Sequence, residues 1–445
     1  KKKFVLRRKT LLLRSAEVKK EFEESVAENW KGACGNGKVW EQYKNCVLKA
    51  ADEVCGWTKG RCRHGETWWW NENVRAAVEE KKAKFKEWIK EKTDVNKLSY
   101  NQAKRCAKKA VAVAVKEASD KLVKEMESDR TSKVLFKAVR QAAKDGKDVI
   151  GTGYIRNELG KMCYGERERS VAWKMHMEKV MNEENKCDGE VEADVVQGPI
   201  DRVTEGEVMR AIKAMKMGKA AGVSEIAAEH VVASGRVGVV VMTELCNRVL
   251  AGEGMPEEWR DSVLVPLYKG KGDARECGAY RGVKLLEHCM KIVERVFERR
   301  LREVVEVNDM QCGFMPGKGT IDALFMVRML QEKYDRKKKK LYMCFVDLEK
   351  AFDRVPREVI RWALRKKGVN EYMVEAVMRM YDGARTKVKV GDGLSEAFEV
   401  KVGLHQGSVL SPLLFVIVMD AVCGGVMEGL LYEILYADDL VLMAD

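Results

Sequence analysis

The sequence predicts a mixed α/β domain that follows a mainly α-helical, basic region. Residues 71–146 hold one Gly, at position 146, and no Pro, amid dense Ala, Lys, Glu and Val, which favours long amphipathic helices. From about residue 203, short apolar runs alternate with helical patterns, as in folds that combine sheet and helix. Basic charge is concentrated early: residues 1–150 hold 37 Lys+Arg and 22 Asp+Glu, and the remaining 295 hold 45 and 47.

Length and composition indicate a soluble globular protein. The 445 residues suffice for two or three domains, and 46% hydrophobic with 34% charged residues is typical of globular chains. No apolar run approaches the roughly 18–20 residues that span a bilayer, so we expect no membrane segment. The 13 Cys occur singly. Because Cys55, Cys62 and His64 match no common zinc module, we interpret the cysteines as structural and expect a reducing, intracellular compartment.

We expect three regions: a basic helical region over residues 1–182, a polar linker over 183–202, and the α/β domain over 203–445. In the first region, Phe85, Trp88 and Ile89 share one helical face, with lysines around them. The net charge of +15 over residues 1–150 is either the footprint of a polyanionic partner or an ordinary solvated surface. The triplet Trp68–Trp70 either stacks on bases or packs in a core.

Within the α/β domain, local signals place several elements. Thr204 and Glu207 form a capping box that opens a helix through about Met217, closed by Gly218. Pro356 suits the first turn of a helix that runs to Gly368. We also expect two buried strands and one hairpin: Ser262–Leu267, Met343–Leu348, and Lys387–Val390 with Phe398–Val402.

The chemistry lies in three aspartates. Asp438 and Asp439 stand between two apolar, strand-like runs, and adjacent buried carboxylates are costly unless a divalent cation neutralises them. Asp347 ends another apolar strand and can meet that turn on a neighbouring strand. Such carboxylates could hold two Mg²⁺ ions about 4 Å apart, the spacing of two-metal phosphoryl transfer.

Six ordered motifs resemble those of reverse transcriptases from non-LTR (LINE-type) retrotransposons, especially RTE- or jockey-like elements. Tyr436–Asp439 is similar to their Y-x-D-D box, and Phe345–Asp353 resembles their first catalytic motif. The other similar blocks are Gly403–Pro412, Gly218–Gly222, Ala279–Gly282 and Gln311–Thr320. The resemblance implies a right-hand polymerase architecture, with an α+β palm and helical fingers. The chain would end just after the Y-x-D-D box and lack the thumb.

The resemblance also implies roles for matching residues. Asp347, Asp438 and Asp439 would be catalytic metal ligands for Mg²⁺, with Mn²⁺ as a substitute. Phe352 would be the steric gate that selects deoxynucleotides. The implied nucleotide-binding residues are Gln406, Gly407 and Arg281, with Lys269 and Lys271 as weaker candidates. Each also has a plain structural interpretation, Phe352 as a core residue and the two lysines as turn charges.

The implied activity is RNA-directed DNA polymerisation by nucleotidyl transfer to a primer 3′-end. Its partners would be an RNA template, a DNA primer or target and deoxynucleoside triphosphates, and its site of action would be the nucleus. Two alternatives remain open: a catalytically inactive RNA-binding remnant, or an intron-maturase-like reverse transcriptase. Gly222–Glu225 departs from the Gly-Pro-Asp-Gly of relatives, which puts that turn of the fingers in question. Template specificity, host and oligomeric state are outside what the sequence determines.

Overall fold

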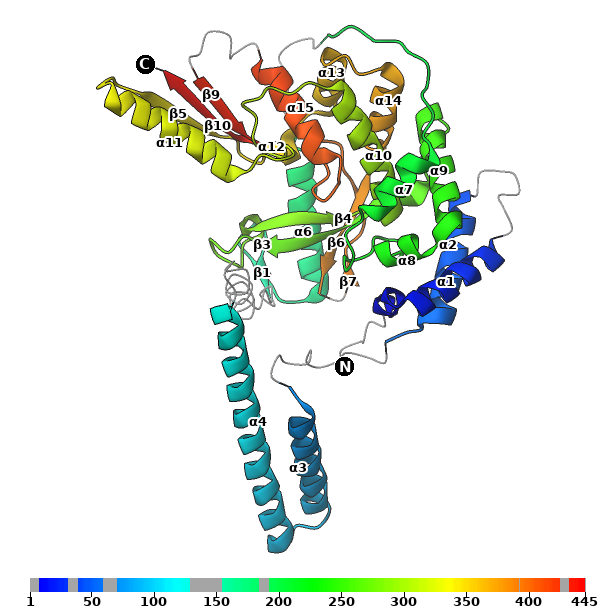
Figure 1. The fold of residues 1–445 in the computed structure, drawn as a ribbon, viewed down its shortest axis with the longest axis vertical. Coiled ribbons are helices and arrows are strands. Elements are labelled where there is room, and N and C mark those ends of the chain that lie inside the picture. Colours follow the sequence, from blue (N-terminus) through cyan, green and yellow to red (C-terminus); the bar gives the residue numbers. More distant parts are fainter. Residues whose placement is uncertain are drawn as a thin grey trace. The chain divides into compact units, whose positions relative to one another are not determined.

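The computed structural model describes residues 8–30, 39–58, 70–128, 154–183, 192–391, 393–424 and 432–444. Packing divides the chain into two compact units, drawn as ribbons in Figure 1. The first joins Leu6–Thr58 to Gly151–Asp445, and the second holds Lys59–Ile150. The boundaries expected at residues 182 and 203 were based on composition, whereas the two units are defined by which residues pack together. Among the described residues, no helix is long and apolar enough to cross a bilayer.

The first unit combines helices with three sheets in its described part, which confirms the predicted mixture of helix and sheet. A five-stranded sheet has the order β4-β3-β6-β7, with β8 also paired to β6; a second has the order β5-β10-β9; β1 and β2 form a third. The strands are β1 (Ile155–Arg156), β2 (Met162–Cys163), β3 (Asp261–Tyr268), β4 (Tyr280–Leu285), β5 (Tyr342–Asp347), β6 (Arg385–Val390), β7 (Gly393–Leu394), β8 (Phe398–Glu399), β9 (Tyr432–Tyr436) and β10 (Asp439–Ala444). The helices are α1 (Ala16–Asn29), α2 (Val39–Ala50), α6 (Glu166–Met181), α7 (Glu205–Lys213), α8 (Ala228–Ala233), α9 (Gly235–Ala251), α10 (His288–Val304), α11 (Thr320–Arg336), α12 (Ala351–Arg354), α13 (Arg357–Lys366), α14 (Glu371–Arg379) and α15 (Ser411–Cys423).

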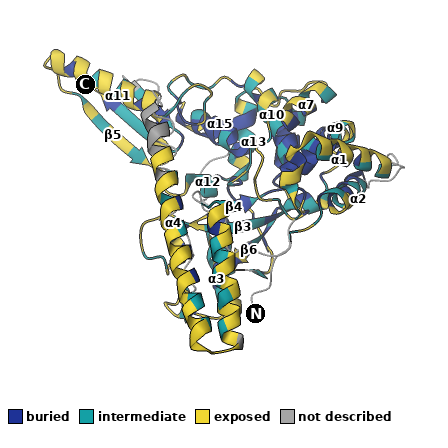
Figure 2. Cartoon of the chain, turned by 60° about the horizontal axis from the view of Figure 1, so that its bottom comes forward, coloured by how far each residue is buried: buried dark blue, intermediate teal, exposed yellow. Residues whose placement is uncertain are grey.

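One large hydrophobic core runs through the first unit. Figure 2 shows its buried residues where α9, α10, α13 and α15 meet. The N-terminal helices α1 and α2 belong to the same core, although they precede it by almost 200 residues. Trp40 of α2 packs edge-on against Trp259 at 5.2 Å between ring centroids, and the Tyr43 hydroxyl lies 2.8 Å from Ser234 Oγ. The start of the chain is therefore built into the α/β unit.

Several predicted elements are confirmed, with shifted ends. The Thr204 capping box is present: Thr204 Oγ1 accepts from Glu207 N, and Glu207 Oε2 accepts from Thr204 N. The helix was predicted to reach Met217 but ends at Lys213, because the loop after it is held by Gly218 N, which donates to Glu229 Oε1 at 2.6 Å. The helix after Pro356 ends at Lys366 rather than Gly368. β3 confirms the strand expected at Ser262–Leu267. The predicted hairpin is confirmed only in part: β6 covers Lys387–Val390 but turns back into β7, and β8 is limited to Phe398–Glu399, which pair with Thr386 and Arg385 at the start of β6. Asp392 lies outside the described residues.

The prediction that Met343–Leu348 is a buried strand was wrong. β5 covers Tyr342–Asp347 but pairs only with β10 among the described strands, so it is an edge strand. The Phe345 side chain is 68% exposed. An apolar run looks the same in sequence whether a strand lies at the centre or the edge of a sheet.

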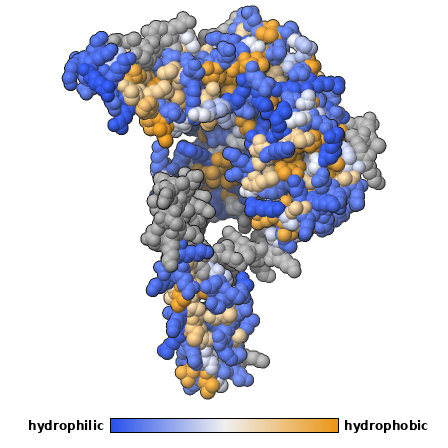
Figure 3. Space-filling model, in the orientation of Figure 1, coloured by the Kyte–Doolittle hydropathy of each residue, from blue (hydrophilic) through white to orange (hydrophobic). Residues whose placement is uncertain are grey.

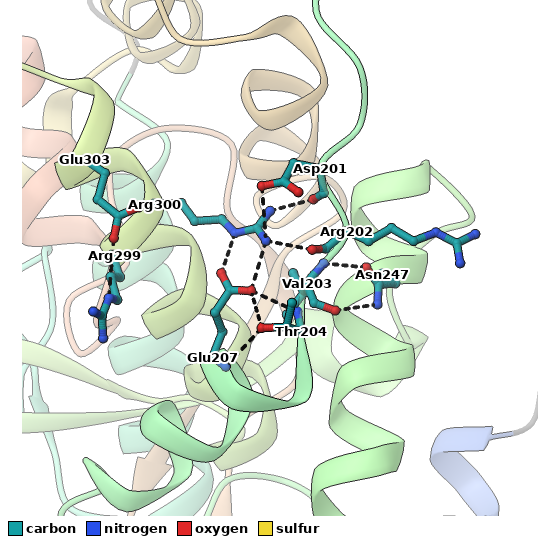
Figure 4. A network of polar contacts seen from close by, with 9 residues as sticks. All are labelled: Asp201, Arg202, Val203, Thr204, Glu207, Asn247, Arg299, Arg300 and Glu303. Atoms are coloured by element: carbon teal, nitrogen blue, oxygen red, sulfur yellow. Dashed lines mark hydrogen bonds and ion pairs between the residues drawn. The ribbon is translucent and has the colours of Figure 1, made fainter.

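An ion-pair network ties the segment before α7 to α10 and α9 (Figure 4). Arg300 of α10 donates from Nε to Glu207 Oε1 at 2.7 Å, and its terminal nitrogens donate to the carbonyl oxygens of Asp201 and Arg202. Asn247 of α9 bonds both the N–H and the carbonyl of Val203. The end of the predicted linker is thus docked on two helices, while its residues 184–191 lie outside the described part.

The second unit is described over residues 70–128 and contains a helical hairpin, which confirms the helices predicted there. α3 (Glu72–Lys90) and α4 (Asp94–Ser128) are joined by a short turn. Phe85, Trp88 and Tyr100 form one aromatic cluster between them, with Trp88 stacked on Tyr100 at 5.6 Å. The predictions for Cys62, His64, Trp68 and Trp69 fall outside the described residues.

Candidate active site

The three predicted aspartates meet where β5 and the β9–β10 hairpin end. β10 pairs antiparallel with β5 and places Asp439 opposite Asp347, while β9 and β10 join through Ala437 and Asp438. Directly opposite residues of an antiparallel pair share a face, with Cβ atoms about 5 Å apart. Figure 1 shows α11 lying along this sheet.

The carboxylates disturb one another electrostatically. The pKa of Asp439 is raised by partial burial and then by the charges of Asp438 and Asp347. Like charges placed directly opposite destabilise a sheet, but Asp347 and Asp439 are exposed rather than buried as predicted, so solvent screens part of this repulsion. A bound cation would relieve the rest. Oxygen donors of this kind suit Mg²⁺, which takes one or two carboxylates and completes its shell with water and phosphate oxygens. Among the described residues, no three acidic, His or Cys side chains are gathered closely enough to hold a metal ion by themselves.

The turn that carries the aspartates rests on the segment Gln311–Gly313. Ala437 has φ of +59°, and its N–H donates to Gln311 Oε1 at 3.1 Å. The same Oε1 accepts from Gly313 N at 2.7 Å. A Cβ built on Gly313 would lie 2.1 Å from Ala437 N, so only glycine allows this approach. The motif residues Gln311 and Gly313 therefore position the Asp438–Asp439 turn, a role that we did not predict.

Phe352, the predicted steric gate, is half-buried in an aromatic stack. Its ring lies 4.5 Å from that of Phe415 in α15 and 5.9 Å from that of Phe314, which follows Gly313. It thus contacts both the segment beneath the catalytic turn and the main core. This packing agrees with Phe352 as a core residue, and its role as a steric gate stays a prediction.

Gln406 is held by a carboxylate that we did not predict as functional. Its Nε2 donates to both carboxylate oxygens of Asp353 in α12, at 2.8 and 2.9 Å. Burial raises the pKa of Asp353, although the hydrogen bonds from Gln406 and the charges of Lys284, Lys350 and Lys269 oppose that rise. Asp353 is the last residue of the motif Phe345–Asp353, so the motif could be identified in the sequence, whereas its contact with Gln406 could not.

The loop that carries Gln406 and Gly407 is wedged against β4. Gly407 has φ of +116°, and a Cβ there would lie 2.5 Å from the carbonyl oxygen of Lys284. The N–H of Lys284 donates to Gln406 O at 2.8 Å. The Lys284 side chain is buried, and burial with the nearby charge of Arg357 lowers its pKa to about 7. His405, which we did not expect to be catalytic, is buried beside Tyr381, and burial lowers its pKa.

The predicted basic residues lie on the β3–β4 hairpin and its connection. Arg281 is an exposed residue of β4, opposite Leu267 of β3. Lys269 and Lys271 are exposed in the connection, where Lys269 Nζ donates to Gly278 O at 3.2 Å. The structure thus joins Gln406 and Gly407 to the hairpin of Arg281 through β4.

Comparison with known proteins shows which protein family the site region is similar to. Residues 269–445 match the family described as "Reverse transcriptase (RNA-dependent DNA polymerase)". The chain carries a reverse transcriptase domain. The probable RNA-directed DNA polymerase from transposon BS of Drosophila melanogaster is 25% identical over 258 residues, 55% of this chain and 28% of that protein. The RNA-directed DNA polymerase from mobile element jockey of Drosophila funebris is 24% identical over 308 residues, 65% of this chain and 33% of that protein.

These relatives are proteins of transposons and mobile elements, and their similarity to this chain confirms the resemblance. The chain spans about a third or less of the length of these two relatives. Among solved structures, a telomerase from Candida tropicalis aligns with a TM-score of 0.33 and 12% identity, over 49% of this chain and 54% of that one. All nine predicted site residues lie within the reverse transcriptase domain.

Proposed function

We propose that this chain is an RNA-directed DNA polymerase of a non-LTR retrotransposon, which extends a DNA primer on an RNA template in the nucleus. The observation that carries the proposal is the pairing of Asp347 with Asp439, with Asp438 in the adjoining turn. In this proposal the sheet β5-β10-β9 is the palm, and the β3–β4 hairpin belongs to the fingers.

Asp347, Asp438 and Asp439 would bind Mg²⁺, or Mn²⁺ in its place, together with water and the phosphate oxygens of the substrate. When bound, the metal lowers the pKa of the attacking hydroxyl and stabilises charge on the phosphate. Arg281 would grip the triphosphate of a deoxynucleotide as a planar cationic fork, with Lys269 and Lys271 as further cations. Gln406 and Gly407 would border the nucleotide, and Phe352 would exclude a 2′-hydroxyl. Oligomeric state is no part of the proposal.

The test is metal-dependent primer extension on an RNA template by the purified chain. We expect Asp438→Asn to lower kcat at least about 1,000-fold, because metal-assisted transfer supplies several kcal/mol of transition-state stabilisation. The matched control is Asp335→Asn, which removes one exposed carboxylate at the end of α11 and should leave the rate unchanged.

Extension that is equal in Asp438→Asn and the parent chain would contradict the proposed site. No extension by the parent chain, combined with salt-dependent RNA binding, would favour the RNA-binding remnant instead.

A further inference from the structure

The second unit carries a one-sided basic surface on α4. Residues 95–116 contain six basic and no acidic residues. The six are Lys97, Lys104, Arg105, Lys108, Lys109 and Lys116, and all are exposed. We call them the α4 stripe. Within the described residues, no ion pair to any of them is present; Lys104 lies over the Tyr100 ring at 5.9 Å.

The α4 stripe lies on the helix face opposite the face that packs. The buried residues of this stretch are Ala103, Ala107 and Ala114, which follow helical spacing. At about 100° per residue, the stripe is centred roughly 150° from that buried line. The stripe extends over about 30 Å at 1.5 Å per residue. Figure 3 shows hydrophilic surface along both flanks of the α3–α4 hairpin, with an apolar strip between them.

This charge pattern differs from that of an ordinary solvated helix. Exposed helices typically place acids four residues from bases, and like charges at that spacing destabilise the helix. Here Lys104 with Lys108 and Arg105 with Lys109 are like-charged pairs at that spacing. α3 shows the ordinary pattern, with Lys84 paired to Glu87 at 2.9 Å. Because these like-charged pairs destabilise α4, the stripe indicates that the helix binds a polyanionic partner.

We propose that the α4 stripe binds the phosphate backbone of double-stranded RNA, outside the polymerase site. The nearby aromatic rings of Phe85, Trp88 and Tyr100 pack on one another, and Trp88 stacks on Tyr100, so much of their ring surface is already covered and less is left for stacking single-stranded bases. The stripe offers Lys and Arg side chains, which contact phosphates without reading the sequence, and duplex RNA is recognised largely through its backbone and shape. The choice of RNA over DNA rests on the proposed function, because RNA is the molecule that such a polymerase copies.

The test measures binding of the full chain to a labelled RNA duplex of about 20 base pairs, longer than the stripe, without metal or nucleotide. The stripe variant is Lys104→Gln/Arg105→Gln/Lys108→Gln/Lys109→Gln. The affinity should fall at least about tenfold, and the slope of log K against log salt should flatten by about 3 to 4, since each phosphate contact contributes about 0.9 for a duplex.

The matched control removes the same charge from cations that have acidic partners in the first unit. Lys20, Lys49, Arg236 and Arg299 pair with Glu24, Glu53, Glu205 and Glu303. Their fourfold replacement by Gln should leave the slope unchanged. A second variant, Lys104→Arg/Lys108→Arg/Lys109→Arg, keeps the charge and should bind as the parent chain does.

Unchanged affinity and slope in the stripe variant would overturn the proposal, as would loss of binding in the charge-retaining variant. Tighter binding to a DNA duplex of the same sequence would overturn the assignment to RNA. Primer extension is measured separately, so a polymerase that fails to extend still gives a decisive binding result, and the converse also holds.

Discussion

At the scale of single residues, the candidate site contains positioning contacts as well as the three carboxylates proposed to be catalytic. Gln311 accepts hydrogen bonds from the backbone N–H groups of Ala437 and Gly313, and Gly313 packs so closely on Ala437 that a Cβ would not fit. Together they position the turn that carries Asp438. Asp353 positions Gln406, because both of its carboxylate oxygens accept hydrogen bonds from Gln406 Nε2. An ionised carboxylate can only accept hydrogen bonds, so it binds the NH₂ group of the amide and leaves the amide oxygen pointing away from it.

Asp353→Asn tests this positioning role. The Asn amide would present a donor where Gln406 needs an acceptor, so Gln406 should turn its oxygen toward residue 353. We expect KM for the deoxynucleotide to rise about tenfold with little change in kcat, an effect of roughly 1.4 kcal/mol. Steady-state extension kinetics would measure it.

The double variant Asp353→Asn/Gln406→Glu reverses the donor and acceptor and should recover part of the lost affinity. The exposed Asp382→Asn serves as the neutral control. If kcat fell and KM stayed constant, Asp353 would have a role other than holding Gln406.

At the scale of elements, the α7–α10 junction depends on one ion pair with a defined pH response. Burial works to raise the pKa of Glu207, but hydrogen bonds from Arg300 and Thr204 outweigh it and lower that pKa to about 2, from an ordinary 4.5. The folded state therefore binds this proton less readily than the unfolded chain does. The contribution of Glu207 to stability is present above about pH 4.5 and is lost as pH falls toward 2.

Glu207→Gln should lower the free energy of unfolding at neutral pH by about 1 to 3 kcal/mol, because Arg300 loses a charged acceptor. It should also flatten the fall in stability between pH 4.5 and 2. Denaturant unfolding at several pH values measures both effects. Glu205→Gln, in the same first turn and paired with Arg236 at the surface, should change neither; an equal loss in Glu205→Gln would show a general helix-end effect.

At the scale of the whole molecule, the order of the chain and the order of packing differ. Helices α1 and α2 share a core with α9 and α10, whereas the intervening residues 59–150 form a unit of their own. The basic residues 1–150 are therefore divided between the two units. Helices α1 and α2 stabilise the first unit, and the α3–α4 hairpin of the second unit carries the α4 stripe.

Trp40→Ala should destabilise the first unit by about 3 to 5 kcal/mol, since it removes a buried ring that packs on Trp259. Thermal unfolding measures the loss. Leu11→Ala is the control, because Leu11 is 64% exposed and should cost less than about 0.5 kcal/mol.

A protease site inserted between residues 58 and 70 gives a second test at this scale. After cleavage, the N-terminal fragment should stay bound to the remainder of the parent chain, and Trp40→Ala should weaken that association. Free release of the fragment from the parent chain would contradict the shared core.

From the sequence, the candidate site and several local elements could be predicted. The three aspartates, the Thr204 capping box and the strand β3 can be identified there because each depends on neighbours in the chain or on the order of short motifs. The roles predicted for Phe352, Gln406, Gly407, Arg281, Lys269 and Lys271 stay predictions.

Only the tertiary structure decided which distant residues meet. Gln311 reaches Ala437 across 126 positions, Gln406 reaches Asp353 across 53, and Tyr43 reaches Ser234 across 191. Periodicity and propensity describe a window of a few turns, so they carry no record of such contacts. The same limit explains why β5 was expected to be buried: an apolar strand does not reveal whether a second neighbour will pair with it.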